Sequence, residues 1–184
     1  MNKISIVALI VAVTACGSAA SAAPPKTRSV ASATPLAATG SGATGQPPAA
    51  MGVEAKRQMK HFQDEVLPRE LARFKASCGY EVAVDVDWES FGNDAERIRG
   101  LSSNRGFGSE LNEGFHHVCK DQIGKDGVQK QIKRISIKNI ADKANKKMVL
   151  EAGVFRLELA LDIKLLIEGT FPSGAYRSYL EKTL

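Results

Sequence analysis

The feature of this chain that most constrains its fold is residues 155–168, in which apolar and polar side chains alternate. An apolar residue stands at every second position from Phe155 to Ile167, and charged or small residues fill most of the positions between them. Successive side chains of a β-strand point to opposite faces, so this pattern predicts a strand with one apolar and one mostly polar face. Because the stretch exceeds the usual strand length, we expect a bend or a break within it.

Three further stretches predict strands. Residues 80–88 alternate in the same way, and residues 134–140 and 147–151 predict two shorter strands. Helical patterns between and around them complete the order α-β-α-β-β-β-α, and strands joined by short connections are expected to pair antiparallel. We therefore predict the α+β class, with a four-stranded, mainly antiparallel sheet and helices packed on one of its faces.

A long amphipathic helix is predicted over residues 53–77, where apolar side chains recur at spacings of three to five. Pro68 lies within this run and has no backbone N–H, so we expect the helix to kink or restart near residues 66–67. Gly79 follows as a candidate left-handed cap that ends the helix. This helix is the natural cover for the apolar face of the sheet.

The first fifty residues differ sharply in composition from the rest. They contain no Asp or Glu and consist mainly of Ala, Ser, Gly, Pro and Thr, so they cannot bury enough apolar surface to fold. Residues 51–184 are predicted to form a single α+β domain. Since Lys3, Lys26 and Arg28 all precede that domain, most of the net charge of +5 lies outside it. A nearly neutral domain argues against a nucleic-acid partner.

The amino terminus has the pattern of an export signal. Lys3 precedes a short apolar run, residues 4–13, which is too short to span a bilayer as a helix. The next residues, Val13-Thr14-Ala15-Cys16, resemble the lipobox of bacterial lipoproteins. The resemblance covers the signal segment alone, and the usual Leu is replaced by Val13.

This resemblance implies that residues 1–15 are removed as a signal peptide and that Cys16 is lipidated. It further implies that residues 16–50 form a lipid-anchored flexible linker. Gly17, rather than Asp, resembles signals for the outer membrane, which places the domain in the periplasm on an acyl anchor. The alternative is cleavage after Ala20-Ser21-Ala22, which would release a soluble periplasmic protein.

Two cysteines remain in the domain once Cys16 is lipidated or removed. Exported domains usually oxidise such a pair, so we predict a disulfide between Cys78 and Cys119. The alternative is a reactive thiol at Cys119 beside His116 or His117.

Metal sites are suggested only weakly. Glu113 and His116 have the i, i+3 spacing of helical metal ligands, but a second such pair is absent from the sequence. The acidic residues from Asp85 to Glu96 match the spacing of a calcium loop only superficially, because Ser90 stands where that loop requires Gly. We therefore predict neither a metal nor a cofactor.

Candidate partner-binding residues lie on two loops and one strand. The loops at residues 102–108 and 169–174 each place one Phe among glycines: Phe107, with Arg105 nearby, and Phe171. Asp85 and Asp87 contribute to an acidic strip on the open face of the sheet, which would receive a basic partner. The alternatives are that the phenylalanines point inward as loop anchors and that the strip is a solvated sheet face.

The sequence carries no recognisable catalytic motif. We predict a non-enzymatic, lipid-anchored periplasmic domain that binds another envelope or secreted protein, as an inhibitor, an immunity protein or an accessory of an envelope complex. The main alternative is a small-ligand or cell-wall-binding module with a cavity between the sheet and the first helix. An unrecognised hydrolase is a further alternative, which requires His116, His117 and acidic side chains in one cleft.

Overall fold

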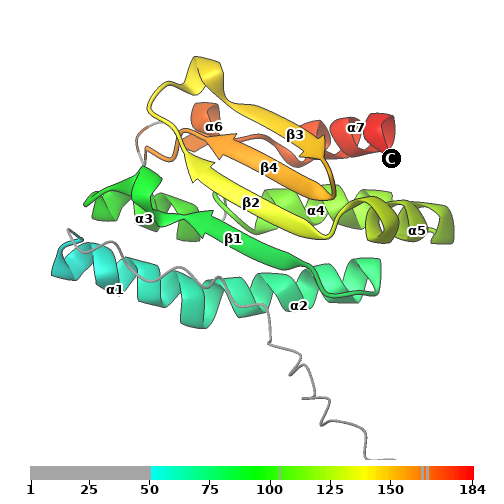
Figure 1. The fold of residues 1–184 in the computed structure, drawn as a ribbon, viewed down its shortest axis with the longest axis horizontal. Coiled ribbons are helices and arrows are strands. Elements are labelled where there is room, and N and C mark those ends of the chain that lie inside the picture. Colours follow the sequence, from blue (N-terminus) through cyan, green and yellow to red (C-terminus); the bar gives the residue numbers. More distant parts are fainter. Residues whose placement is uncertain (1–50, 104, 163, 165) are drawn as a thin grey trace, which may run out of the picture. The chain divides into compact units, whose positions relative to one another are not determined.

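The computed structural model describes residues 51–103, 105–162, 164 and 166–184. The signal segment, Cys16 and the linker lie outside the described residues. The domain combines one sheet with helices that precede the first strand, connect the first strand to the second, and follow the last strand (Figure 1). Its helices are α1 (Val53–His61), α2 (Leu67–Cys78), α3 (Ala95–Ser102), α4 (Ser109–Val118), α5 (Gln122–Gln131), α6 (Leu166–Gly169) and α7 (Ser173–Thr183). Its strands are β1 (Ala83–Asp87), β2 (Arg134–Asn139), β3 (Lys147–Glu151) and β4 (Val154–Leu159).

The predicted α+β class is confirmed, but the prediction of a mainly antiparallel sheet is wrong. The four strands lie in the order β1-β2-β4-β3, with β1 parallel to β2 and β2 parallel to β4. Only the β3–β4 hairpin is antiparallel. The connection from β1 to β2 runs through α3, α4 and α5 and therefore returns the chain to the same end of the sheet. After β2 the chain reverses direction to form β3 and reverses again to form β4. The strand β4 lies between β2 and β3 and therefore runs parallel to β2.

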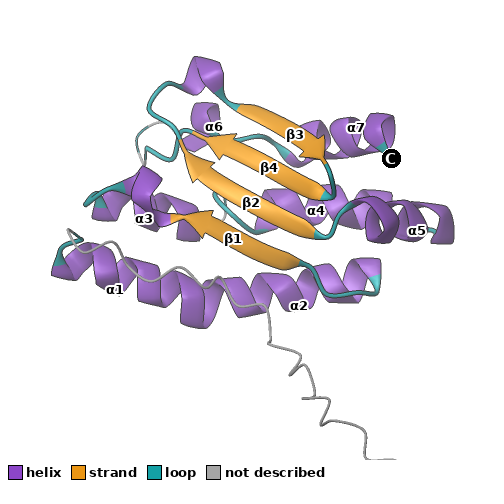
Figure 2. Ribbon diagram, in the orientation of Figure 1, coloured by secondary structure: helices purple, strands orange, loops and turns teal. Residues whose placement is uncertain are grey.

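One face of the sheet forms the core. Val84 and Val86 of β1, Ile135 of β2, and Phe155 and Leu157 of β4 are buried, whereas the residues between them are mostly polar. In Figure 2, α4 and α7 lie behind this face.

Aromatic side chains connect the helices to that face. The ring of Phe115 on α4 lies 4.9 Å from that of Phe74 on α2 and 6.0 Å from that of Phe155, as measured between ring centroids. Tyr179 on α7 stacks on the other side of Phe155, at 5.8 Å.

The long alternating stretch breaks as expected, because β4 ends at Leu159. Beyond it the backbone N–H of Ala160 donates to the carbonyl oxygen of Gly169 at 2.9 Å instead of joining a strand. The two segments approach so closely that a Cβ on Gly169 would lie 2.0 Å from the carbonyl oxygen of Ala160. The chain therefore folds back on itself, and the end of the predicted strand becomes the short helix α6.

The predicted restart of the first helix is also confirmed. A π-helical turn, Phe62–Val66, separates α1 from α2, and Pro68 occupies the first turn of α2. Proline is tolerated there because the first N–H groups of a helix have no intrahelical partner. Gly79 ends α2 in the left-handed conformation, with φ of 82°.

The two cysteines of the domain are joined. Cys78 at the end of α2 and Cys119 just after α4 form a disulfide, with 5.0 Å between their Cα atoms. The bond fixes the carboxyl-terminal end of α2 against that of α4, and these two helices frame the polar contacts described next.

Candidate functional site

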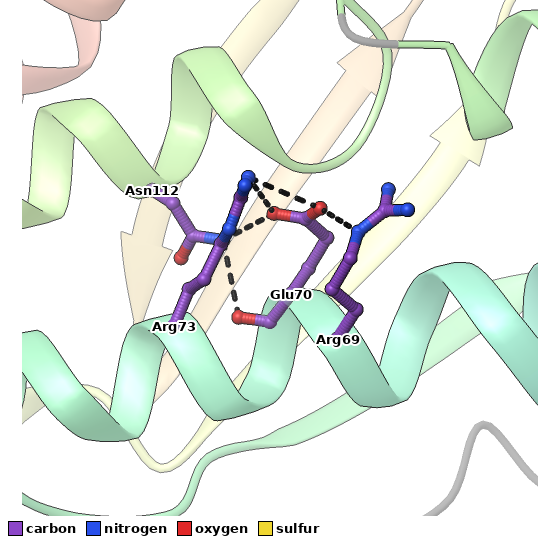
Figure 3. Close-up of polar contacts among 4 residues, drawn as sticks. All are labelled: Arg69, Glu70, Arg73 and Asn112. Carbon is purple, nitrogen blue, oxygen red and sulfur yellow. Dashed lines mark hydrogen bonds and ion pairs between the residues drawn. The ribbon is translucent and has the colours of Figure 1, made fainter.

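A buried carboxylate lies at the seam between α2 and α4. The side chain of Glu70 on α2 is only 3% exposed. Its Oε1 accepts from Nε of Arg69 at 2.9 Å, and its Oε2 accepts from Nδ2 of Asn112 on α4, also at 2.9 Å. Nη1 of Arg73 lies 3.4 Å from Oε2 and 3.5 Å from Oε1. Figure 3 shows the two arginines on either side of Glu70, with Asn112 reaching down from α4.

This arrangement satisfies Glu70 with two cationic donors and one amide. Nδ2 of Asn112 also donates to the backbone oxygen of Glu70, at 3.1 Å. A buried carboxylate is stable only when it is paired and hydrogen-bonded, and here both conditions are met. The contacts therefore tie the first turn of α2 to the first turn of α4.

The loop before α4 is fitted to the same carboxylate. Gly108 has a φ of 144°, and a Cβ there would lie 2.8 Å from Cδ of Glu70. The neighbouring Phe107 is 5% exposed, and its ring packs edge-on against Phe62 at 5.8 Å between centroids. Phe107 thus points inward, as the loop-anchor alternative predicts, so its side chain is not available to a partner. Arg105 in the same loop is exposed.

The second loop is anchored in a similar way. Phe171 is half-buried, and its ring packs edge-on against Tyr176 of α7 at 5.8 Å. Nζ of Lys146 lies 5.1 Å from the centre of the Phe171 ring and donates to the backbone oxygen of Thr170 at 2.8 Å. Phe171 therefore retains some accessible surface, unlike Phe107, but both residues hold their loops to the domain.

The predicted acidic strip faces basic side chains of the same sheet. Oδ2 of Asp85 lies 2.5 Å from Nη1 of Arg134 on β2. Asp87 accepts from the backbone N–H of Ser90 at 3.3 Å and so caps the turn that follows β1. This arrangement favours a solvated sheet face over a receptor for a basic partner.

The register extends that charge pairing across the sheet. In the strand register, Asp87 of β1 lies opposite Lys138 of β2, and Lys138 lies opposite Glu158 of β4. Glu158 in turn lies opposite Lys147 of β3. Lys147 Nζ and Glu158 Oε1 lie 3.3 Å apart. This row across the open face therefore alternates acidic and basic residues.

A groove runs between α2 and the start of β1. It has a volume of about 400 Å³ and is lined by Pro68, Leu71, Ala72 and Lys75 of α2 with Glu81, Val82 and Ala83. Most of its α2 wall is apolar. At one end Lys75 Nζ donates to Oε1 of Glu81 at 2.7 Å, and this bond lowers the pKa of Glu81. The groove lies between the sheet and the first long helical segment, where the small-ligand alternative expects a cavity.

A second hollow lies on the other side of α2, against α4. It has a volume of about 500 Å³ and is lined by Arg73, Ala76, Ser77, Ser109, Asn112, Glu113 and His116. Ser77 Oγ and His116 Nδ1 lie 3.4 Å apart. His117 is not among the lining residues, and its Nε2 lies 3.8 Å from Oε1 of Glu113. The hollow thus holds only one of the two histidines that the hydrolase alternative requires.

Metal ligands do not gather in the part of the chain that the structure describes. There, no group of three or more His, Cys, Asp and Glu side chains is arranged to hold a metal ion. Asp85 and Asp87, which belong to the calcium-loop spacing, lie on β1. Asp85 forms an ion pair with Arg134, and Asp87 accepts from the backbone N–H of Ser90, so both carboxylates have partners within the domain.

The Glu70 cluster is the feature that the sequence patterns did not single out. A signal for it is present, because Glu70 stands four residues after Val66 and four before Phe74, on the buried side of α2. An acidic residue on the apolar stripe of a helix needs a partner. The identity of that partner, Asn112, depends on a contact between helices far apart in the chain.

No protein-family model matches this chain, and neither a curated protein nor a solved structure does. Among the described residues, no helix combines the length and the apolar character needed to cross a membrane.

Proposed function

We propose that this protein is a lipid-anchored periplasmic domain without enzymatic activity that binds another envelope or secreted protein through the exposed side of α2. The observation that carries the proposal is that α2 is flanked by two hollows, the groove beside β1 and the hollow beside α4. A partner that covers α2 reaches both at once.

The side chains on α2 suit a protein interface. Leu71 is half-buried in the groove, while Pro68 and Ala72 are exposed beside it. Arg69 and Arg73 follow on the same helix, with side chains 55% and 58% exposed. Arginine is enriched in protein interfaces, and apolar pockets rimmed by polar groups supply their contact centres.

The amino-terminal segment supports an anchored role. The lipobox-like sequence ending at Cys16 implies an acyl anchor, and residues 17–50 have the composition of a flexible linker. Such a linker has an average reach of roughly 30 Å, which lets the domain meet a partner away from the membrane surface. An inhibitor, an immunity protein or an accessory of an envelope complex would use such a tether. A soluble periplasmic form remains the alternative to the outer-membrane anchor.

A second function, binding of a small ligand or of cell-wall material, is favoured by the size of the groove. Ligand pockets usually enclose about 300–1,000 Å³, and the groove falls within that range. Its Lys75–Glu81 pair would provide the polar contact.

The experiment compares two exposed positions that receive the same bulky charged side chain. Ala72→Arg would obstruct the groove, whereas Ser178→Arg adds the same side chain to α7, which lines neither hollow. The full-length, oxidised protein captures partners from a solubilised envelope fraction of its own organism. Captured proteins are identified by mass spectrometry, purified and tested again with each variant.

We expect one protein to bind the wild type and Ser178→Arg at near-equal stoichiometry and to bind Ala72→Arg at least about tenfold more weakly, a loss of about 1.4 kcal/mol. Equal binding by both variants would exclude the α2 surface. If no protein binds and a small molecule fills the groove instead, the second function replaces the first.

A further inference from the structure

The two arginines of the Glu70 cluster use only a small part of their hydrogen-bonding capacity. Arg69 donates to Glu70 through Nε, and Arg73 contacts it through Nη1. A guanidinium group has five N–H donors. The described residues provide no further partner for either group. Both guanidinium groups therefore present unused donors to solvent.

Burial separates the carboxylate from the arginines that it holds. Glu70 is 3% exposed, whereas the side chains of Arg69 and Arg73 are more than half exposed. A buried carboxylate is costly to desolvate, and it contributes little net stability compared with an apolar residue of similar size. What it does provide is position, because it holds two long, flexible side chains against the seam between α2 and α4. Figure 3 shows this arrangement, with Glu70 between the two arginines.

The hollow beside the cluster offers additional donors. Arg73 lines it together with the hydroxyl groups of Ser77 and Ser109 and the ring of His116. Glu113 also lines it, but that carboxylate is 60% exposed and faces His117.

We propose that the hollow between α2 and α4 binds an acidic side chain, Asp or Glu, of the partner protein, with Arg73 as its main ligand. This inference rests on the proposed protein-binding function and names the chemistry of the partner. A guanidinium group matches a carboxylate with two parallel N–H donors, and Glu70 holds Arg73 ready for that contact. Glu70 is a positioning residue here and does not touch the partner.

The first test uses two short peptides that differ only in charge. Acetyl-Ala-Asp-Ala-amide, acetyl-Ala-Asn-Ala-amide and inorganic phosphate are each titrated into the full-length, oxidised protein, and the arginine side-chain N–H signals are followed by NMR. We expect saturable shifts at Arg73 with the Asp peptide and none with the Asn peptide. Equal responses to both peptides would overturn the proposal. A response to phosphate without a response to the Asp peptide would also overturn it.

A matched pair of variants tests the place of binding without disturbing Glu70. Ala76 is exposed and lines the hollow. Ala76→Glu adds a negative charge to its wall, and Ala76→Gln adds a side chain of the same shape without charge. We expect Ala76→Glu to weaken binding of the Asp peptide about tenfold, since like charges repel at short range, and Ala76→Gln to change it less than about twofold. An equal effect of both variants would overturn the proposal.

The outcome is separable from that of the proposed function. If Ala72→Arg abolishes capture of a protein but the Asp peptide does not bind, the domain still binds a partner and only the carboxylate site is wrong. If the peptide binds but no protein is captured, the site is present and the protein-binding function fails.

Discussion

Asn112 Nδ2 donates to Glu70 Oε2 at 2.9 Å and to the Glu70 backbone oxygen at 3.1 Å, which joins α4 to α2 across 42 residues of sequence. The acceptor is a carboxylate that is 3% exposed, so water cannot replace this donor easily. The pair is therefore a structural contact that also fixes the position of two exposed arginines.

Replacing Asn112 with Ala should lower the free energy of unfolding by about 2 kcal/mol, because two acceptors of a buried residue lose their donor. Urea unfolding of the oxidised protein measures the change. Asn145→Ala serves as the control, since the Asn145 amide bonds only to the exposed Asp142, at 3.4 Å. A control change within about 0.5 kcal/mol is expected. Equal losses in both variants would show that the buried contact adds nothing.

Gly108→Ala should destabilise the domain by more than about 1 kcal/mol, for two reasons. The residue has a φ of 144°, and its new Cβ would lie 2.8 Å from Cδ of Glu70. Gly174→Ala is the matched control, because nothing lies within 4 Å of a Cβ there.

A double-mutant cycle separates these two causes. Glu70→Ala removes the atoms that the Cβ would meet, so Gly108→Ala should cost less in that background than in the wild type. An unchanged cost would assign the whole effect to the backbone conformation of Gly108.

Reduction of the Cys78–Cys119 disulfide should lower the free energy of unfolding by about 4 kcal/mol in the chain-entropy model, since the bond spans 41 residues. This loss of stability is measured by comparing the melting temperature of the oxidised protein with that of the double variant Cys78→Ala, Cys119→Ala. In the native, unreduced protein a thiol reagent should label neither residue, as peptide mass spectrometry can check. Labelling of both would show that the native domain is reduced.

Stability should fall at alkaline pH because Tyr176 is fully buried and Tyr80 is partly buried. Burial raises the pKa of Tyr80 and that of Tyr176 well above the ordinary tyrosine value. The unfolded chain then ionises first, so stability is complete below about pH 10 and decreases as the pH rises above it. Urea unfolding across this pH range, with tyrosinate absorbance on the same samples, measures the effect.

Tyr80→Phe isolates one of the two groups. Tyr80 Oη donates to the backbone oxygen of Ile132 at 2.9 Å, so the variant loses stability at neutral pH. It should lose less on going to alkaline pH than the wild type does. An equal alkaline loss in both proteins would exclude Tyr80 as a contributor.

Much of the local structure could be predicted from the sequence. The alternation that buries Val84 and Val86, the restart of the helix before Pro68 and the cap at Gly79 all depend on a few neighbouring residues. Backbone sterics and side-chain periodicity act over such distances, so these features were accessible without a fold. The pairing of Cys78 with Cys119 was expected from their number and from the predicted export signal.

The candidate site was predicted less well. Phe107 and Phe171 were expected either on the surface or as loop anchors. In the structure Phe107 packs against Phe62 and is buried, whereas Phe171 packs against Tyr176 and is half-buried. Glu70 was expected on the polar side of its helix with the other charged residues, but the structure buries it and pairs it with Asn112.

The sequence by itself determined where most helices and strands lie and which of their faces are apolar. Only the tertiary structure decided that β1, β2 and β4 run parallel, that Glu70 meets Asn112, and that two hollows flank α2. The physical reason is the range of the interactions. Local preferences act within a few residues, whereas strand direction and buried polar pairing depend on where a connection of many residues returns the chain.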